Sequence, residues 1–440
     1  MAILCILLVL LPGCQEQQQA IAVSGHADML PPSSVSVEPT QEQKLERYVQ
    51  GMTLEEKVGQ LFYVTIGNLG QPGESVSPGG TGITEREIEV LQQYAPGGII
   101  LMGSNIYSDS QVQELIGTLQ DSSRIPLFIG VDEEGGMVSR LGKADGISME
   151  NVGSMKAIGA SQDERQAYET GKTLASGLSA LGFNMDFAPV ADVLTNPNNY
   201  EIGSRSFGSD AILVANMVRN EVQGLQEHGI CAVAKHFPGH GGVIGNSHNN
   251  LQYVDTSLEE LRNTEFLPFQ AAIQADSDVI LISHLVLTDV EPEHPSTLSR
   301  SVVNGLLREE LGYEGIIITD SFQMGSITEN YDQAEAAVMA IQSGCDMILM
   351  PAEYESCYQG ILEAVQTGSI TEEQINQICI RILQTKIKRG ILTMDQVEFL
   401  FCSIPQSALR TGRISNHIYG RGLRIHSHID TLRFLIVRYE

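Results

Sequence analysis

The chain has 440 residues, of which 42% are hydrophobic and 18% charged, so it can bury the core of one large or two ordinary domains. Its formal net charge of −28 argues against nucleic acid and anionic membrane surfaces as partners, because both attract basic patches. No stretch reaches the roughly 20 consecutive apolar residues that a membrane-spanning helix needs.

The N-terminus has the pattern of an exported protein. Its first eleven residues are almost wholly apolar, and residues 11–14 read Leu-Pro-Gly-Cys, which is similar to a bacterial lipoprotein signal. We expect residues 1–14 to be this signal, with Cys14 lipidated after cleavage, and residues 15–40 to be a disordered tether. The protein would then be extracytoplasmic, with a lipid anchor as its only membrane contact. The alternative is a disordered or core N-terminus.

Apolar runs and amphipathic stretches alternate after the tether. Thr53 and Glu56 form a capping box that predicts the start of a helix. Short apolar strands are predicted at residues 62–66, 98–102, 127–131, 184–189, 230–236, 279–284, 315–320 and 346–350. Helical patterns occupy residues 41–50, 85–93, 111–119, 165–181, 211–228, 258–274, 301–311, 332–343 and 371–390.

Eight buried strands that each precede a helix are typical of a (β/α)₈ TIM barrel, an α/β fold. A doubly wound open sheet is the alternative, but eight repeats favour closure. We place a single barrel domain at residues 41–395. Residues 396–440 form a basic extension, since positions 401–440 hold six arginines and only two acids. Trimming the chain near residue 396 is expected to leave folding and activity intact.

Polar residues follow five of the predicted strands. A (β/α)₈ barrel places its active site at the C-terminal ends of its strands, so these residues are expected to meet at one face. They are Asp132, Glu133 and Glu134 after strand three, Asp192 after strand four, Lys235 and His236 at strand five, Ser283 and His284 at strand six, and Thr319 and Asp320 at strand seven.

Residues 235–248 form the motif that says most about function. They read Lys-His-Phe-Pro-Gly-His-Gly-Gly-Val-Ile-Gly-Asn-Ser-His. Pro238 and Gly239 prevent a continuous helix, so His236 and His240 are not the paired ligands of a zinc-binding helix. The glycines instead predict a loop that can change shape over a pocket, with His248 on it. A polar surface loop with incidental histidines is the alternative.

This motif, with the opening at residues 52–61, closely resembles family 3 glycoside hydrolases, in particular the β-N-acetylglucosaminidase branch. The resemblance covers about residues 46–392. It implies a β-N-acetylhexosaminidase that removes terminal β-linked N-acetylglucosamine with retention, from peptidoglycan fragments during cell-wall turnover. The expected partner is a β-GlcNAc-terminated saccharide or muropeptide. We expect a monomer without metal or cofactor.

The resemblance assigns the two chemical roles. Asp320, at the end of a buried strand, matches the family's nucleophile, and His248 matches the acid/base on the mobile loop. An imidazole can give and retake a proton near pH 7. Where this branch carries an aspartate that supports the histidine, this chain has Asn246, which can orient the ring but supplies no charge.

The remaining site residues are expected to hold the sugar or orient these groups. For Glu133 and Glu134 a solvated turn is the alternative. The substrate-binding candidates are Asp132, Arg140, Arg205, Lys235 and His236, and the orienting candidates are Asn246, Asp192 and His284.

Other functions fit parts of the sequence. Asn246 motivates a catalytically impaired muropeptide-binding lipoprotein. A β-N-acetylglucosaminide phosphorylase also remains open, because a neutral histidine admits an anionic phosphate better than a carboxylate does. A transporter's solute-binding lipoprotein would need two lobes and a hinge, which the continuous eightfold alternation disfavours.

Overall fold

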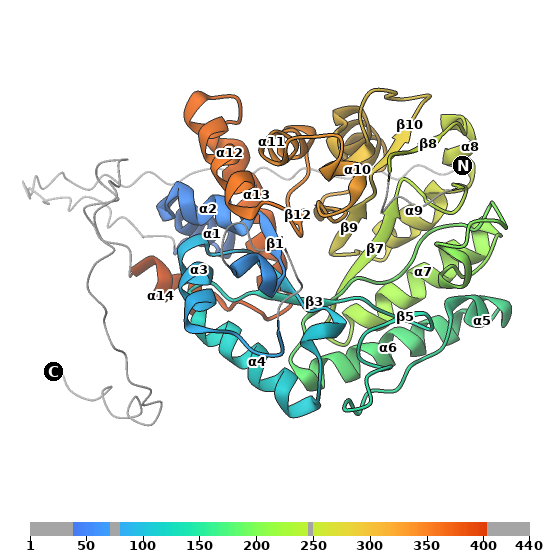
Figure 1. Cartoon of the computed structure of the whole chain (residues 1–440), viewed down its shortest axis with the longest axis horizontal. Helices are drawn as coiled ribbons and strands as arrows, with labels where there is room; N and C mark the ends of the chain where they lie inside the picture. Colours follow the sequence, from blue (N-terminus) through green and yellow to red (C-terminus); the bar gives the residue numbers. More distant parts are fainter. Residues whose placement is uncertain (1–37, 71–79, 245–249, 403–440) are drawn as a thin grey trace, which may run out of the picture. The chain divides into compact units, whose positions relative to one another are not determined.

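The computed structural model describes residues 38–70, 80–244 and 250–402 of the chain (Figure 1). The chain divides into two compact units, Met1–Pro39 and Thr40–Glu440, and every helix and strand given below belongs to the second. The predicted lipidation site Cys14 and the loop residues Asn246 and His248 lie outside the described residues.

Eight parallel strands form the central sheet and close it into a barrel. Their order is β11-β9-β7-β6-β3-β2-β1-β12, and a parallel bridge between Ile318 and Met347 joins the two ends. The predicted (β/α)₈ fold is therefore confirmed, and the open sheet is excluded. The barrel strands are β1 Phe62–Val64, β2 Gly98–Ile100, β3 Phe128–Val131, β6 Met185–Asp186, β7 Cys231–Phe237, β9 Val279–Ile282, β11 Ile316–Thr319 and β12 Ile348–Leu349.

Helices surround the sheet, as Figure 1 shows. Most of the longer ones match the predicted amphipathic segments, but α12 and α14 were not predicted. The predicted helix 258–274 is two helices, broken at Thr264 and Glu265. The α-helices are α1 Gln41–Gly51, α2 Leu54–Gln60, α3 Glu85–Tyr94, α4 Asp109–Ser122, α5 Met155–Ala160, α6 Glu164–Leu181, α7 Ala211–Gln226, α8 Leu258–Asn263, α9 Phe266–Gln274, α10 Gly325–Thr328, α11 Gln333–Ser343, α12 Tyr354–Thr367, α13 Glu372–Lys388 and α14 Met394–Cys402; Ser301–Glu310 is a π-helix.

The predicted capping box at the start of α2 is present. The Thr53 hydroxyl accepts from the Glu56 backbone N–H at 3.1 Å, and the Glu56 carboxylate accepts from the Thr53 N–H at 3.0 Å. Two otherwise unsatisfied donors of the first turn are thereby paired. The cap fixes where α2 begins, and the chain then enters β1 directly.

Two small sheets lie beyond the ends of the barrel strands. β4 (Glu133–Gly135) pairs antiparallel with β5 (Val138–Ser139), immediately after β3. β8 (Gln252–Val254) pairs in parallel with β10 (Leu285–Leu287), which follows β9. Both sheets extend from C-terminal strand ends, the face at which the site was predicted.

The last helix crosses the predicted boundary at residue 396. Val397 and Leu400 of α14 are buried, and Glu398 pairs with Lys44 of α1 at 2.7 Å. A truncation that spares these contacts ends after Cys402 rather than at residue 396. Among the described helices, none is long and apolar enough to cross a membrane.

A buried lysine lies at the N-terminal end of the barrel, opposite the predicted site. Lys386 of α13 donates to the Gln60 side chain at 2.9 Å and lies 5.1 Å from the centroid of the Phe128 ring. Burial lowers its pKa to about 7 from the ordinary 10.5. Burying Lys386 in its charged form therefore costs folding free energy.

Lys386→Met is expected to stabilise the protein at neutral pH by about 1–3 kcal/mol. The unfolded chain keeps this proton up to its ordinary pKa of 10.5, whereas the folded chain releases it near 7. Wild-type stability therefore rises with pH between these values, and the penalty is greatest below pH 7. Urea unfolding at pH 6, 7 and 10 measures the difference, which should shrink towards pH 10.

Lys388→Met on the same helix is the matched control. Lys388 is paired with Asp276 at 2.7 Å and with Asp278 at 2.8 Å, so its loss should destabilise rather than stabilise. If Lys386→Met lowers stability at pH 6, burial of the charged lysine is not the unfavourable contact described here.

Candidate active site

One cavity opens at the C-terminal ends of the strands and has a volume of about 390 Å³. This is within the range of pockets that hold small molecules. It brings together six of the predicted site residues from four different strand ends. They are Asp132, Arg140, Arg205, Lys235, His236 and Asp320.

Lys235 is the central cation of the pocket. Its ammonium group lies 2.8 Å from Asp132 Oδ1 and 2.7 Å from Glu134 Oε1, with only 4% of the side chain exposed. Asp132 also lies 3.8 Å from the Arg140 guanidinium. Residues 132 and 134 point to the same side because successive side chains of an extended segment alternate. Lys235 therefore joins two carboxylates of the strand-three segment to β7.

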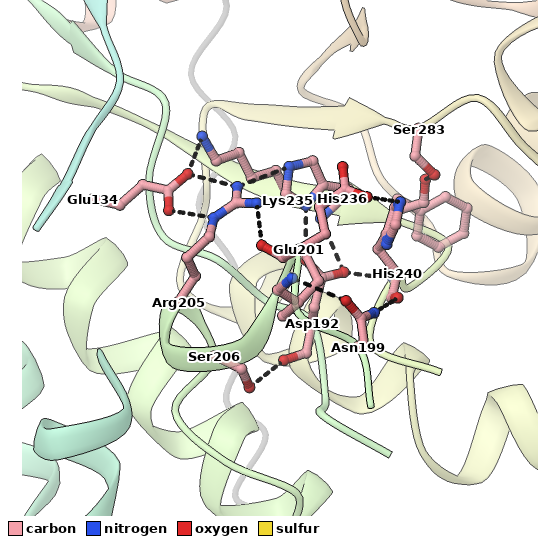
Figure 2. Close-up of polar contacts among 12 residues, drawn as sticks. Glu134, Asp192, Asn199, Glu201, Arg205, Ser206, Lys235, His236, His240 and Ser283 are labelled. Atoms are coloured by element: carbon pink, nitrogen blue, oxygen red, sulfur yellow. Dashed lines mark hydrogen bonds and ion pairs between the residues drawn. The ribbon is translucent and has the colours of Figure 1, made fainter. Parts of the chain in front are cut away.

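Glu134 is a buried member of the site, so the alternative of a solvated turn is excluded. Arg205 holds its carboxylate through two parallel bonds, from Nε to Oε2 and from Nη2 to Oε1, both 2.8 Å (Figure 2). Burial alone would raise the pKa of Glu134, but Lys235 and Arg205 outweigh it and lower this pKa to about 2. Glu134 is thus an anion throughout the physiological range.

Glu133 is also buried, and its carboxylate orders the following loop. It accepts from the backbone N–H groups of Arg140 and Leu141, both at 2.7 Å, and from the Ser139 hydroxyl. These bonds fix the backbone from which the Arg140 side chain reaches the cavity. The alternative of a solvated turn is excluded here too, because the strand-three segment folds back on itself as β4 and β5.

Asp192 connects the strand-four loop to the motif of β7. This fully buried carboxylate accepts from His236 Nδ1 at 2.7 Å and from the His240 backbone N–H at 2.6 Å (Figure 2). Burial would raise its pKa, but His236 and His240 lower it overall. The predicted orienting role of Asp192 thus has a direct geometric basis.

The tautomer of His236 follows from its two partners. A carboxylate only accepts, so Nδ1 carries the proton, and Arg205 only donates, so Nε2 accepts from Nη2 at 3.4 Å. A single neutral tautomer satisfies both contacts. His236 therefore presents one defined edge at the cavity wall.

The loop after β7 depends on glycine for close packing rather than for freedom alone. A Cβ at position 241 would lie 1.8 Å from the Val193 carbonyl oxygen, and Gly239 has φ +123°, which favours glycine. The Asn199 side chain donates to the His240 carbonyl at 2.7 Å. The described first part of the loop, up to Ile244, is therefore fastened to the strand-four loop.

Asp320 occupies the end of β11 and lines the cavity. Its backbone N–H donates to the Ile282 carbonyl at 2.7 Å, and its Oδ1 accepts from the Ser321 N–H at 2.8 Å. These bonds fix the backbone at residue 320, and Asp320 lines the same cavity as Asp132, Arg205 and Lys235. Its role as nucleophile stays a prediction.

The cavity also contains groups that the sequence reasoning did not assign to it. Glu201 lies on its wall, with its carboxylate 4.0 Å from His240 Nε2. Glu134, His240, Ser321 and Gln323 are further polar residues of the lining. The other lining side chains are apolar. They are Ile100, Met102, Val138, Phe187, Ile202, Leu281, Met324, Leu349 and Met350.

A further buried carboxyl group, that of Glu221, lies near enough to Glu134 for the Glu134 charge to act on it. Glu221 of α7 is fully buried, and neither of its side-chain oxygens has a hydrogen-bond partner among the described residues. Burial and the negative charge of Glu134 raise its pKa to about 8. It is therefore neutral at pH 7 and becomes a destabilising anion in alkali.

Glu221→Gln is expected to remove part of the alkaline instability of the fold. The folded state keeps this proton up to a pKa of about 8, whereas the unfolded chain releases it near 4.5. Wild-type stability should therefore fall as pH rises between these values, and the variant should lose this dependence. Denaturation midpoints at pH 6 and pH 9 test it. Glu227→Gln near the end of α7, where the carboxylate accepts from the Tyr168 hydroxyl, is the control and should keep the wild-type pH dependence.

The arrangement of the cavity defines a class of protein. A barrel with a carboxylate at the end of strand seven, facing ion-paired acids and bases across a sugar-sized cavity, can stabilise a developing cation and bind hydroxyl groups. These are the requirements of a glycoside hydrolase.

Comparison with known proteins identifies the family. The model of the glycosyl hydrolase family 3 N-terminal domain matches residues 53–385, and the chain belongs to this family, as its motifs predicted. A β-hexosaminidase of Xylella fastidiosa is 30% identical over 346 residues, which cover 78% of this chain and 96% of the relative. β-Hexosaminidase A of Pseudoalteromonas piscicida is 29% identical, and the match spans 58% of its length.

Solved structures agree with this placement. A family 3 β-N-acetylglucosaminidase from Paenibacillus has a TM-score of 0.71 and 35% identity, with 79% of this chain and 68% of that chain covered. A β-N-acetylhexosaminidase from Beutenbergia cavernae has a TM-score of 0.67 and 25% identity, with 76% and 98% covered.

Proposed function

We propose that this protein is a retaining β-N-acetylhexosaminidase that releases terminal β-linked N-acetylglucosamine. The observation that carries the proposal is the position of Asp320, which lines the same cavity as Asp132, Arg205 and Lys235. The relatives support the sugar, since they are named β-hexosaminidases and a β-N-acetylglucosaminidase. The methionines of the cavity wall are suited to the methyl group of an acetamido substituent.

The reaction would run in two steps. Asp320 attacks the anomeric carbon and forms a glycosyl ester while His248 protonates the leaving oxygen. The same imidazole then takes a proton from water, which releases the sugar from Asp320 with its original configuration. Throughout both steps, Lys235, Asp132 and Glu134 supply the charged groups that bind the sugar hydroxyls.

The biological setting is a further part of the proposal. The lipoprotein-like residues 1–14 would place the enzyme outside the cytoplasmic membrane, held by a lipid on Cys14. Peptidoglycan fragments are the β-GlcNAc-terminated saccharides of that compartment, so cell-wall turnover is the proposed role. Labelling with a radioactive or alkynyl fatty acid tests the anchor, and Cys14→Ala should abolish the label.

Hydrolysis of p-nitrophenyl β-N-acetylglucosaminide tests the activity. Wild type should release p-nitrophenol, and NMR should show the β-anomer of the sugar as the first product. Asn246→Asp should raise kcat, because a carboxylate beside His248 stabilises the imidazolium that forms. An α-anomer as the first product would contradict retention.

Asn246 motivates the second candidate, a sugar-binding lipoprotein with impaired catalysis. It predicts that wild type binds N-acetylglucosamine in calorimetry yet cleaves nothing, while Asn246→Asp gains activity. Repeating the assay in phosphate buffer separates the phosphorylase alternative, which would yield N-acetylglucosamine 1-phosphate instead of free sugar.

A further inference from the structure

A buried imidazole lies behind the residue that follows Asp320. His284 comes directly after β9 and the buried Ser283, and its side chain is fully buried. Its Nε2 lies 3.0 Å from the Ser321 carbonyl oxygen, and its Nδ1 lies 2.8 Å from the Thr297 hydroxyl. A carbonyl only accepts, so Nε2 carries a proton and donates it, and Nδ1 accepts from Thr297. Both ring nitrogens of His284 are therefore hydrogen-bonded within the protein.

The bond from His284 completes a clamp on Ser321. The N–H of Ser321 donates to Asp320 Oδ1 at 2.8 Å, while its carbonyl accepts from His284. On either side, the Asp320 N–H bonds to the Ile282 carbonyl at 2.7 Å and the Phe322 N–H to the Leu349 carbonyl at 2.9 Å. The Ser321 carbonyl shares a peptide with the Phe322 N–H, so His284 and Leu349 together hold the peptide after Ser321, while Ile282 holds the peptide before Asp320.

The orientation of the Ser321 N–H depends on this clamp. That N–H belongs to the peptide that also carries the Asp320 carbonyl, so a rotation of Ser321 would redirect it away from the carboxylate. A carboxylate that must attack a carbon in line tolerates little misplacement, since an error of about 1 Å costs about 10²-fold in rate. A group that fixes the turn therefore acts on catalysis without touching substrate.

We propose that His284 is a positioning residue for the nucleophile, acting through the Ser321 peptide, and that Thr297 sets the tautomer it needs. The proposal rests on the proposed function, because it assigns the attacking role to Asp320. It explains why a fully buried histidine lies at the end of strand six beside the catalytic strand.

Two substitutions of His284 test this role. His284→Leu removes the donor and should lower kcat for p-nitrophenyl β-N-acetylglucosaminide about 10²-fold with little change in KM, since no group that touches sugar is lost. His284→Gln offers an amide N–H to Ser321 and an amide oxygen to Thr297. It should restore most of the lost kcat, which a purely space-filling role would not predict.

Ser296→Ala is the matched control. Ser296 is a neighbour of Thr297, also fully buried, and its hydroxyl donates to the Leu285 carbonyl at 2.7 Å. Its loss should lower the melting temperature but leave kcat unchanged. Thr297→Val removes the hydroxyl that sets the tautomer and should lower kcat, so it carries the test if His284→Leu does not fold.

Two outcomes are separable. Wild-type kcat in a folded His284→Leu or Thr297→Val overturns the positioning role alone, as does a KM effect without a kcat effect. A wild-type protein that cleaves no β-N-acetylglucosaminide overturns the proposed function, and this inference falls with it.

Discussion

Asp320→Asn is expected to lower kcat about 10⁴-fold or more, because loss of a nucleophile removes the covalent step and leaves only binding and polarisation. The amide is nearly the same size and can still accept from the Ser321 N–H, as Oδ1 does at 2.8 Å in the wild type. The melting temperature should therefore change little. Steady-state hydrolysis of p-nitrophenyl β-N-acetylglucosaminide measures the loss.

Asp320→Ala extends this prediction to the position of the nucleophile. The shortened side chain leaves room for a small anion on the side from which Asp320 attacks. Added azide should restore release of an activated dinitrophenyl leaving group and yield the α-glycosyl azide. Formation of the β-azide, or an Asp320→Asn variant within about tenfold of wild type, would show that another group attacks the sugar.

Arg205→Met is expected to remove about 3–5 kcal/mol of stability, because it takes away one of the two cations that pair with the buried Glu134 carboxylate. Arg205 donates two bonds of 2.8 Å to Glu134, one to the Glu201 carbonyl at 3.2 Å and one to His236 at 3.4 Å. The same change should reduce kcat/KM, since three residues that line the cavity lose an anchor. Urea unfolding and initial rates measure the two effects.

The loss of stability in Arg205→Met should be larger at neutral pH than in acid. The pKa of Glu134 is about 2 in the folded protein and ordinarily 4.5, so the pair stabilises fully above pH 4.5 and is lost as pH falls through 2. The difference between wild type and Arg205→Met should thus be larger at pH 7 than at pH 3. Adding Glu134→Gln should recover part of the stability, because it removes the buried anion that has lost its bidentate partner and keeps only Lys235. A double variant less stable than Arg205→Met would contradict this.

The barrel could be predicted because its strands are short, continuously apolar and separated by amphipathic helices. Burial on both faces gives parallel strands this pattern, and the pattern does not depend on distant residues. The helix Tyr354–Thr367 was missed although it is as amphipathic as its neighbours. Helix α14 was missed because the composition changes just beyond it, which drew the predicted boundary to residue 396.

The location of the site residues was predicted more fully than the ion pairs and hydrogen bonds between them. Strand-end position placed Asp132, Lys235 and Asp320 at one face, and the cavity joins them. The partnership of Arg205 with Glu134 was not foreseen, because 71 residues separate them and only barrel closure brings them together. The two-residue spacing of Asp132 and Glu134 was the signal that could have revealed the second acid.

The position of the Glu201 side chain could not be predicted from the sequence, because Glu201 lies in a loop. It follows no strand directly, so neither periodicity nor strand-end position indicates which way its side chain points. The fold directs it into the cavity because the strand-four loop is tied to the loop after β7 through Asn199. Sequence patterns fix the faces of helices and strands, whereas loop side chains depend on such tertiary bonds.

Trapping of the glycosyl-enzyme tests the central claim most directly. A 5-fluoro-N-acetylglucosaminyl fluoride should inactivate the enzyme by forming a stable ester, and mass spectrometry of the digested protein should locate one sugar on the peptide that contains Asp320. An adduct on another carboxylate of the cavity, such as Glu201, would contradict the account. So would rapid hydrolysis of the fluoride that forms no adduct and releases the sugar as its α-anomer.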